Sequence, residues 1–487
     1  MRQQFISKSL VCVSLAGMVL TIGACGKKKS SSGGGTTNTE TINNALALAI
    51  PGTLAVASPT ASKSATLLTD DPVDFSSRKN ANVERLNCAD AATCVKTFAL
   101  PTDRNNPTCY GPNLDYQNHP NGSPTSGQLP SGDLGLWSAA ESTGEACVAA
   151  KMNTEVENVA AYATLAMDMT SMVFGAANLA GKSLPAVGAT EDFKSAVTDK
   201  MTGQNIGGTI DTATVTRNDD SGGRPKYTTT LKITPATAGT VTSMTVVLTH
   251  IALDDTNATY KGRMKVYLAE TGAKKAKGIS LHYNRASSTS LKYAVRSRES
   301  SDSAITIDTL FDSTGDVIYP TGSANDGYKW GIFDLDPQTG LGKVAYLWVA
   351  GFPTENTRSF YAETSASGAD IVGKGYFGFG DALSNITTSN YQTKWLDRMI
   401  CNWAGPSNNH TGVAKAQKQE IKQTGGLGTF ASTSSAITYA PANSCVGDGS
   451  FAGKLTTATS YTTFGTTSDL VTLSAESFTI PAAPNAI

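Results

Sequence analysis

The sequence predicts an α+β fold in which an antiparallel β meander, forming a curved sheet or half-barrel, packs on one long helix behind a disulfide-bearing, loop-rich region. Two observations predict this class. Apolar residues recur at spacings of three and four over residues 153–180, and apolar and polar residues alternate in short runs beyond residue 208. The chain has 487 residues, 40% of them hydrophobic, so it is long enough to bury a large core.

The first 25 residues have the order of a bacterial export signal. Two basic residues precede an apolar run over 11–24, which is too short to span a bilayer and ends in Ile22-Gly23-Ala24-Cys25. This stretch resembles the lipobox of bacterial lipoproteins. The resemblance implies cleavage of a signal peptide (1–24), a diacylglyceryl group on the sulfur of Cys25 and a third acyl chain on its amino group. In lipoproteins, an aspartate after the lipidated cysteine favours retention in the inner membrane. Gly26 stands at that position here, so the resemblance also implies the outer membrane, with the domain on the periplasmic or cell-surface face. The alternative is an ordinary cleaved signal with an incidental cysteine.

Residues 25–60 are expected to be the lipid anchor and a tether rich in Ser, Gly and Thr, because residues 30–39 contain too few apolar groups to offset their ordering entropy. The apolar residues 45–58, broken by Pro51-Gly52, are expected to enter the fold as two short buried strands or turns. Of the eight cysteines, Cys12 leaves with the signal and Cys25 is used by lipid. The remaining cysteines are even in number, and an exported protein meets an oxidising compartment, so disulfides are expected. Proximity in sequence favours the pairs Cys88–Cys94, Cys109–Cys147 and Cys401–Cys445. A zinc site from Cys88, Cys94, Cys109 and His119 is the alternative, which the irregular spacing disfavours.

Residues 61–150 are rich in Asn, Pro and Gly, which predicts loops held by disulfides. The main unit is expected over 151–390. It begins with the long helix at 153–180, and a shorter helix over 190–201 follows Thr190 as N-cap.

The alternating runs predict a series of mostly antiparallel strands. They are 209–217, 226–234, 240–251, 259–269, 278–285, 290–298, 303–311, 343–351, 359–364 and 370–379. Apolar pairs such as Met264 and Val266 alternate with polar residues, so one face is expected to be buried against the long helix. Residues 391–487 form a Cys-containing, Ser/Thr-rich C-terminal region without a chemical signal.

The opposite face of the expected sheet carries a local basic excess. Its members are Lys232, Arg263, Lys265, Lys292, Arg296 and Arg298. Like charges on adjacent strands cost stability, so this face is a candidate site for an anionic ligand such as phosphate, lipid A or an acidic glycan. The alternative is a solvated face balanced by nearby carboxylates.

Three motifs resemble catalytic or ligand-binding sequences, and each departs from its pattern. Asp220-Ser221-Gly222-Gly223 looks like the nucleophile segment of chymotrypsin-type serine proteases, but the leading Gly and a suitable upstream histidine segment are missing, so a hairpin turn is expected. Residues 373–378 match G-x-G-x-x-G but continue as a strand. Residues 334–340 begin like a calcium loop, but Thr339 replaces the required Gly. We therefore expect no catalytic residue, metal or cofactor.

These observations predict a non-catalytic, membrane-anchored envelope lipoprotein. It would bind a hydrophobic or anionic envelope component, such as a lipid, in an apolar cavity between sheet and helix, lined by residues such as Met264, Val266, Leu281 and Met169. A lipid or a glycan is the expected ligand. The architecture is similar to half-barrel lipoproteins that carry or relay lipids. A structural or adhesive cell-surface role is the alternative, and an envelope hydrolase is a weaker one. The balance of 39 basic against 40 acidic residues argues against nucleic acid as a partner.

Overall fold

The computed structural model describes part of the chain. The described residues are 49, 148–149, 151–153, 170, 173–178, 180–203, 208–234, 241–255, 257–319, 327–336, 339, 341–349, 356–382, 386–387, 389–391, 416–426, 430–433, 470–471, 473, 475–485 and 487. The expected signal peptide and the lipidation site Cys25 lie outside them. So do the cysteines expected to form disulfides, namely Cys88, Cys94, Cys109, Cys147, Cys401 and Cys445.

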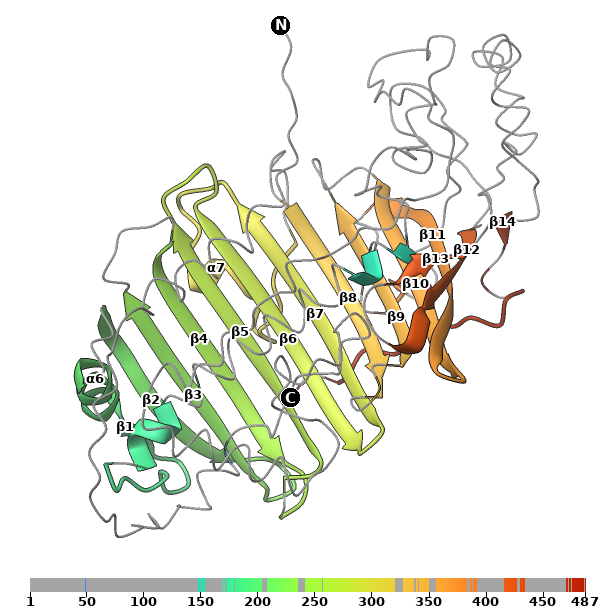
Figure 1. The fold of residues 1–487 in the computed structure, drawn as a ribbon. Coiled ribbons are helices and arrows are strands. Elements are labelled where there is room, and N and C mark those ends of the chain that lie inside the picture. The colour runs from blue at the N-terminus through green and yellow to red at the C-terminus, as the bar shows by residue number, and fades with distance from the viewer. Residues whose placement is uncertain are drawn as a thin grey trace, which may run out of the picture.

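The fold is an antiparallel sheet of 14 strands whose order follows the chain from β1 to β13, with β14 paired to β12 (Figure 1). The strands are β1 (Thr190–Asp192), β2 (Thr209–Asp219), β3 (Pro225–Thr234), β4 (Val241–Ala252), β5 (Tyr260–Glu270), β6 (Ala276–Ser287), β7 (Ser290–Ser300), β8 (Gly327–Leu335), β9 (Gly342–Val349), β10 (Asn356–Ser367), β11 (Asp370–Ala382), β12 (Ala416–Gln423), β13 (Ala431–Ser432) and β14 (Leu470–Val471). Tight turns set several of the registers. Between β10 and β11, for example, Gly368 adopts φ +61°.

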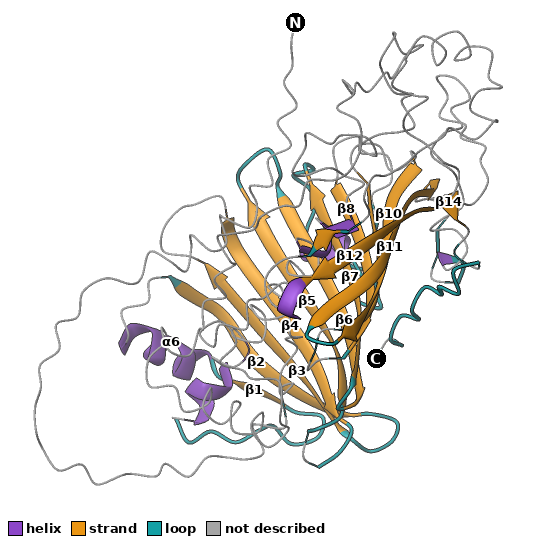
Figure 2. Cartoon of the chain, turned by 45° about the vertical axis from the view of Figure 1, so that its right-hand side comes forward, coloured by secondary structure: helices purple, strands orange, loops and turns teal. Residues whose placement is uncertain are grey.

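Alternation along the strands gives the sheet two distinct faces. In β5, Met264, Val266 and Leu268 are buried on one face, which we call the inner face, while Arg263 and Lys265 lie on the other, the outer face. Figures 1 and 2 show that β10–β12 turn toward the side on which helix α6 (Lys194–Gly203) lies, so the sheet is curved. The inner face lies on its concave side, because α6 contributes Val197 to the same apolar cluster as the inner-face side chains.

The expected α+β class is wrong, because the fold is essentially all-β. The named helices in the described residues are short: α6, α7 (Ile307–Leu310) and the 3₁₀ turn Thr424–Gly426. Most of the expected helix over 153–180 lies outside the described residues; 173–178 are helical, and Phe174 joins the inner cluster. The three- and four-residue spacing of apolar residues predicts a local helix but not how much of the core that helix supplies. In this fold, strands paired in sequence order supply most of the core.

The expected strands coincide with observed ones except at 303–311, which holds α7 instead. The helix expected from residue 190 begins at Lys194, after β1, and its first N–H is capped by the Asp192 carboxylate at 2.8 Å. Strand β8 was not expected, because it is buried on both faces and therefore lacks a polar alternation.

The structure also places two of the motifs. Asp220 and Gly223 form the turn between β2 and β3, where the Asp220 carboxylate accepts from the backbone N–H of Gly222 at 2.9 Å. Gly375 lies within β11, and an added Cβ there would collide with the side chain of Val148. Its missing side chain therefore gives room for close packing rather than forming a phosphate loop.

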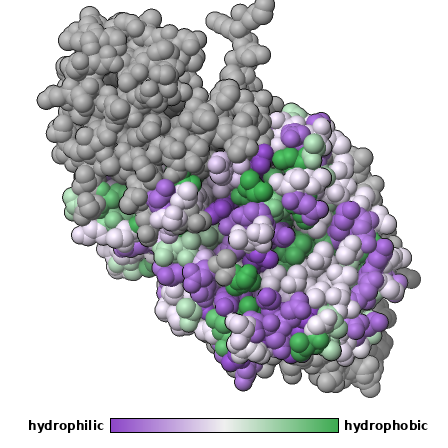
Figure 3. All heavy atoms as spheres, turned by 180° about the vertical axis from the view of Figure 1, so that it is seen from behind, coloured by the Kyte–Doolittle hydropathy of each residue, from purple (hydrophilic) through white to green (hydrophobic). Residues whose placement is uncertain are grey.

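A second apolar cluster covers part of the outer face. Phe478, from the C-terminal segment, packs its ring 5.8 Å from that of Tyr361 and 5.5 Å from that of Tyr376. The Tyr376 hydroxyl donates to the Glu476 carboxylate at 3.3 Å. Strands β12, β13 and β14 also come from residues beyond 391, so this part of the chain shares the sheet. Figure 3 shows this side of the molecule, where polar side chains are interspersed with apolar patches.

Candidate functional site

Residues 301–319, between β7 and β8, fold back across the outer face; we call this segment the strap. It contains α7 (Ile307–Leu310) and a tight turn from Asp312 to Asp316. The Asp312 carboxylate accepts from the backbone N–H of Asp316 at 2.9 Å and from the Thr314 hydroxyl at 2.6 Å. These local hydrogen bonds fix the shape of the turn before it meets the sheet.

Two glycines allow the strap to lie close to the sheet. On β6, a Cβ added to Gly278 would lie 2.5 Å from Cδ2 of Leu310, which is fully buried. In the strap turn, Gly315 adopts φ +83°, and an added Cβ would lie 2.8 Å from Cδ and Nε of Arg263. The strap is therefore seated by Leu310 over Gly278 and by Gly315 over Arg263.

Asp316 is the centre of a half-enclosed polar group that we call the Asp316 cluster, formed with Ser280, His282 and Arg296. Its Oδ1 lies 3.0 Å from His282 Nε2 and accepts from the Ser280 hydroxyl at 3.3 Å. Its Oδ2 lies 3.3 Å from Arg296 Nη1. The Arg296 guanidinium also stacks 4.5 Å from the Trp330 ring centroid. Three strand residues thus hold one strap carboxylate.

The charge state of Asp316 follows from these contacts. Burial by itself raises the pKa of this carboxyl, but the neighbouring His282 and the charge of Arg296 outweigh burial and hold the pKa below its usual value. Asp316 is therefore ionised at neutral pH and pairs with a guanidinium that is itself mostly buried.

Serine, histidine and aspartate are the residue types of a hydrolase triad, but their order in space differs. A triad places the histidine between the serine and the carboxylate. Here Asp316 lies between Ser280 and His282, and the Ser280 oxygen accepts from the backbone N–H of Val317 at 3.2 Å. Ser280 is also fully buried. This arrangement holds the strap and does not activate a nucleophile.

The strap covers four of the six residues proposed for an anionic ligand. Arg296 belongs to the Asp316 cluster. Arg263 donates to the carbonyl of Thr314, and Arg298 donates to the carbonyl of Ile318 at 3.3 Å. The Lys265 ammonium lies 5.5 Å from the centroid of the Phe311 ring.

The other two proposed residues lie outside the strap, and each is near a carboxylate of the sheet. Lys232 is 4.0 Å from Asp211, and Lys292 is 3.5 Å from Asp334. All four side chains are at least one-third exposed, so these pairs contribute little stability. The structure therefore brings together the four basic residues under the strap and leaves Lys232 and Lys292 apart.

Sequence reasoning missed Ser280, His282 and Asp316 as one cluster. Ser280 and His282 alternate with apolar residues in the expected strand over 278–285, which places them on the basic face. The missing information was the strap, because residues 303–311 were expected to be a strand and not a segment crossing that face.

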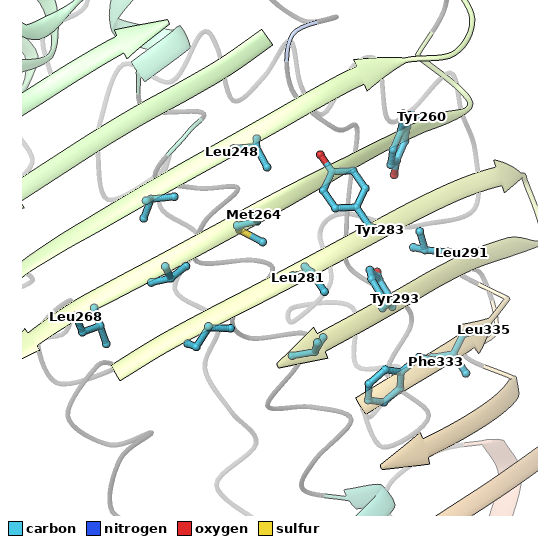
Figure 4. Close-up of a cluster of buried hydrophobic side chains, with 14 of the residues drawn as sticks. Leu248, Tyr260, Met264, Leu268, Leu281, Tyr283, Leu291, Tyr293, Phe333 and Leu335 are labelled. Carbon is cyan, nitrogen blue, oxygen red and sulfur yellow. The ribbon is translucent and has the colours of Figure 1, made fainter. Parts of the chain in front are cut away.

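A second polar group lies among apolar side chains at one end of the inner face. His250 contacts the Tyr283 hydroxyl through Nδ1 at 3.1 Å and the Asn257 amide oxygen through Nε2 at 2.9 Å. Tyr283 crosses over Gly262 of the neighbouring strand and lies beside Tyr260, as Figure 4 shows. Burial lowers the pKa of His250 to about 4, although the Asn257 hydrogen bond opposes the shift, so the ring is neutral at pH 7.

The residues proposed to line an apolar cavity lie on the inner face. Met264, Val266 and Leu281 come from β5 and β6, belong to the inner cluster and are buried, as Figure 4 shows for Met264 and Leu281. Met169 lies outside the described residues.

Gly315→Ala tests the seating of the strap. Both Gly315 and Gly368 have positive φ, but nothing lies within 4 Å of a Cβ at Gly368. Gly368→Ala should cost only the backbone strain of a left-handed residue, about 1–2 kcal/mol. Gly315→Ala should cost about 1–2 kcal/mol more in urea unfolding because the methyl group displaces Arg263. Equal losses in the two variants would contradict this seating.

Within the described residues, no helix is long and apolar enough to cross a membrane. The same part of the chain contains no group of three or more His, Cys, Asp or Glu side chains placed to hold a metal ion. No protein-family model, curated protein or solved structure matches the chain significantly. What the protein does is therefore inferred from its own residues.

Proposed function

We propose that this chain is a non-catalytic lipoprotein of the bacterial envelope, anchored to the outer membrane through acyl chains on Cys25, and that it binds a lipid on the inner face of its sheet. The anchoring rests on the export signal and lipobox-like segment of residues 1–25. Three acyl chains exceed the two signals that stable anchoring needs.

The observation that carries the binding proposal is the extent of the inner face. Its apolar side chains belong to one cluster that crosses the sheet from Leu231 on β3, through Leu281 on β6, to Phe377 on β11. Ligand sites for apolar molecules need such a wall together with a few polar groups that fix orientation. The group formed by His250, Asn257 and Tyr283 supplies these polar groups at one end.

Native mass spectrometry of the full chain carrying Cys25→Ser, exported to the periplasm and purified without detergent, tests the proposal. We expect an adduct of lipid mass that is lost when the protein unfolds. Val266→Phe, which adds volume to the inner face, should reduce the adduct, whereas Thr230→Phe on the outer side of β3 should retain it.

A bare mass in both the parent and the Thr230→Phe protein would contradict lipid binding and favour a structural or adhesive role. The anchoring is tested by the same substitution at residue 25, because Cys25→Ser should move the protein from the membrane fraction to the soluble fraction. Retention in the membrane fraction would contradict anchoring through this residue.

A further inference from the structure

The strap covers a concentration of positive charge on the outer face. Arg263 and Lys265 lie on β5, and Arg296 lies on β7. Strand β6 runs between them, and its residues His282 and Ser280 pair in register with Arg263 and Lys265. Because the three strands are adjacent, these side chains share one small area of the sheet.

The strap places three carboxylates, those of Asp308, Asp312 and Asp316, near this area. Among the described residues, Asp316 is the carboxylate that forms ion pairs with the group, through Arg296 and His282. Arg263 is held by the carbonyl of Thr314, which is a neutral acceptor. Burial lowers the pKa of Lys265, and the nearby charge of Arg263 lowers it further, while the charges of Asp308 and Asp312 oppose the shift. Burial also lowers the pKa of Arg263, and the charges of Asp316 and Asp312 oppose that shift, so the strap carboxylates offset positive charge that the sheet alone leaves exposed.

His282 gives an independent indication of a ligand. Its side chain is 5% exposed, and its Nε2 is the nitrogen that faces Asp316 at 3.0 Å. Within the part of the chain that the structure describes, both ring nitrogens are buried and neither makes a hydrogen bond of good geometry. A buried ring nitrogen without a partner costs free energy, and a hydrogenphosphate ion carries both a hydroxyl group and oxyanion oxygens, so it can donate to or accept from such a nitrogen.

We propose that the area beneath the strap is a binding site for a phosphate-type dianion, and that the strap closes this site by placing the Asp316 carboxylate where the anion would bind. The proposal concerns the outer face and goes beyond lipid binding on the inner face. A guanidinium, an imidazole and a hydroxyl already surround the Asp316 carboxylate, and these are donors that recognise phosphate oxygens. A dianion carries more charge and more oxygens than one carboxylate, so it can also engage Arg263 and Lys265.

The strap has other anchors that would survive loss of the Asp316 charge. Leu310 is fully buried against Gly278, and the Tyr267 hydroxyl donates to the carbonyl of Ile305 at 3.2 Å. Asp316→Asn should therefore remove the internal competitor without detaching the whole segment. Asp334→Asn is the matched control, because Asp334 pairs with Lys292 on the same face but outside the strap.

The experiment measures binding of inorganic phosphate by titration calorimetry to the full chain carrying Cys25→Ser. We expect Asp316→Asn to bind phosphate at least about tenfold more tightly than the parent, and Asp334→Asn to match the parent. Adding Arg296→Gln to Asp316→Asn should abolish the gain. If Asp316→Asn does not fold by circular dichroism, Asp316→Ser replaces it, because this variant also removes the carboxylate from Arg296 and His282.

Vesicles distinguish the two sources of such a dianion. Binding of Asp316→Asn to vesicles containing phosphatidic acid, but not to pure phosphatidylcholine, would support the site with a lipid headgroup as its ligand. Binding of inorganic phosphate without vesicle binding would support the site with free phosphate. The proposal is overturned if the folded variant, Asp316→Asn or its replacement Asp316→Ser, binds phosphate no more tightly than Asp334→Asn.

Discussion

Gly262→Ala is expected to destabilise the protein by about 3 kcal/mol, because the added methyl group has no room in the sheet. A Cβ at this position would collide with the ring and hydroxyl of Tyr283 and would lie 2.5 Å from the carbonyl oxygen of Thr249. Tyr283 is buried and its hydroxyl contacts His250, so the ring cannot move aside without breaking a buried hydrogen bond. The midpoint of urea unfolding measures the loss.

Gly327→Ala is the matched control, because Gly327 also lies in a strand and nothing lies within 4 Å of its added Cβ. It should change stability by less than about 0.5 kcal/mol. A double-mutant cycle isolates the cause, since Gly262→Ala should cost much less in a Tyr283→Ala background. Equal costs of Gly262→Ala with and without the Tyr283 ring would contradict this account.

The strands on which these effects depend are predictable because each buries one face. In β5, Met264 and Val266 point inward while Arg263 and Lys265 point outward, and this alternation is visible in the sequence. Strand β8 is not predictable in this way, because Trp330 packs in the outer cluster and Phe333 in the inner one. A strand covered on both sides has no polar face to reveal it.

The Asp316 cluster could be predicted only in part from the alternation of apolar and polar residues. The outward placement of Ser280 and His282 follows from alternation, but Asp316 is 36 residues from Ser280 and reaches it only because the strap folds back. What seats the strap is the absence of side chains at Gly278 and Gly315. A single sequence does not distinguish such a glycine from one in an ordinary turn.

The fold class was mispredicted for a related reason. The pattern over 153–180 predicts a local helix, and Val173 and Phe174 do lie in the inner cluster. A local pattern carries no information on the share of the core that an element supplies. Here β2 to β12 form a continuous antiparallel sheet, so the strands dominate the fold.

Acidification from pH 7 to pH 4 is expected to cost about 3 kcal/mol of stability through His250 alone. The folded-state pKa of His250 is about 4, below its ordinary value of 6.5, so the unfolded chain binds the proton more tightly. This contribution is fully present above the unfolded pKa and is lost as the pH falls from 6.5 to 4. The lowered pKa of Asp316 and the lowered pKa of Glu299 act at more acidic pH, below their ordinary values near 4.

Urea unfolding at intervals between pH 7 and pH 4 measures this dependence. His250→Gln should lower the free energy of unfolding at pH 7. It should also make that free energy depend less on pH, because glutamine does not titrate. Asn257→Gly is the matched control: residue 257 has φ +57°, which glycine tolerates, and the variant loses the amide that contacts His250 while keeping the imidazole. Asn257→Gly should lower the free energy of unfolding but keep the same dependence of that free energy on pH as the parent protein. If His250→Gln keeps the slope of the parent protein, another group is responsible for the acid sensitivity and the buried, neutral state of His250 is wrong.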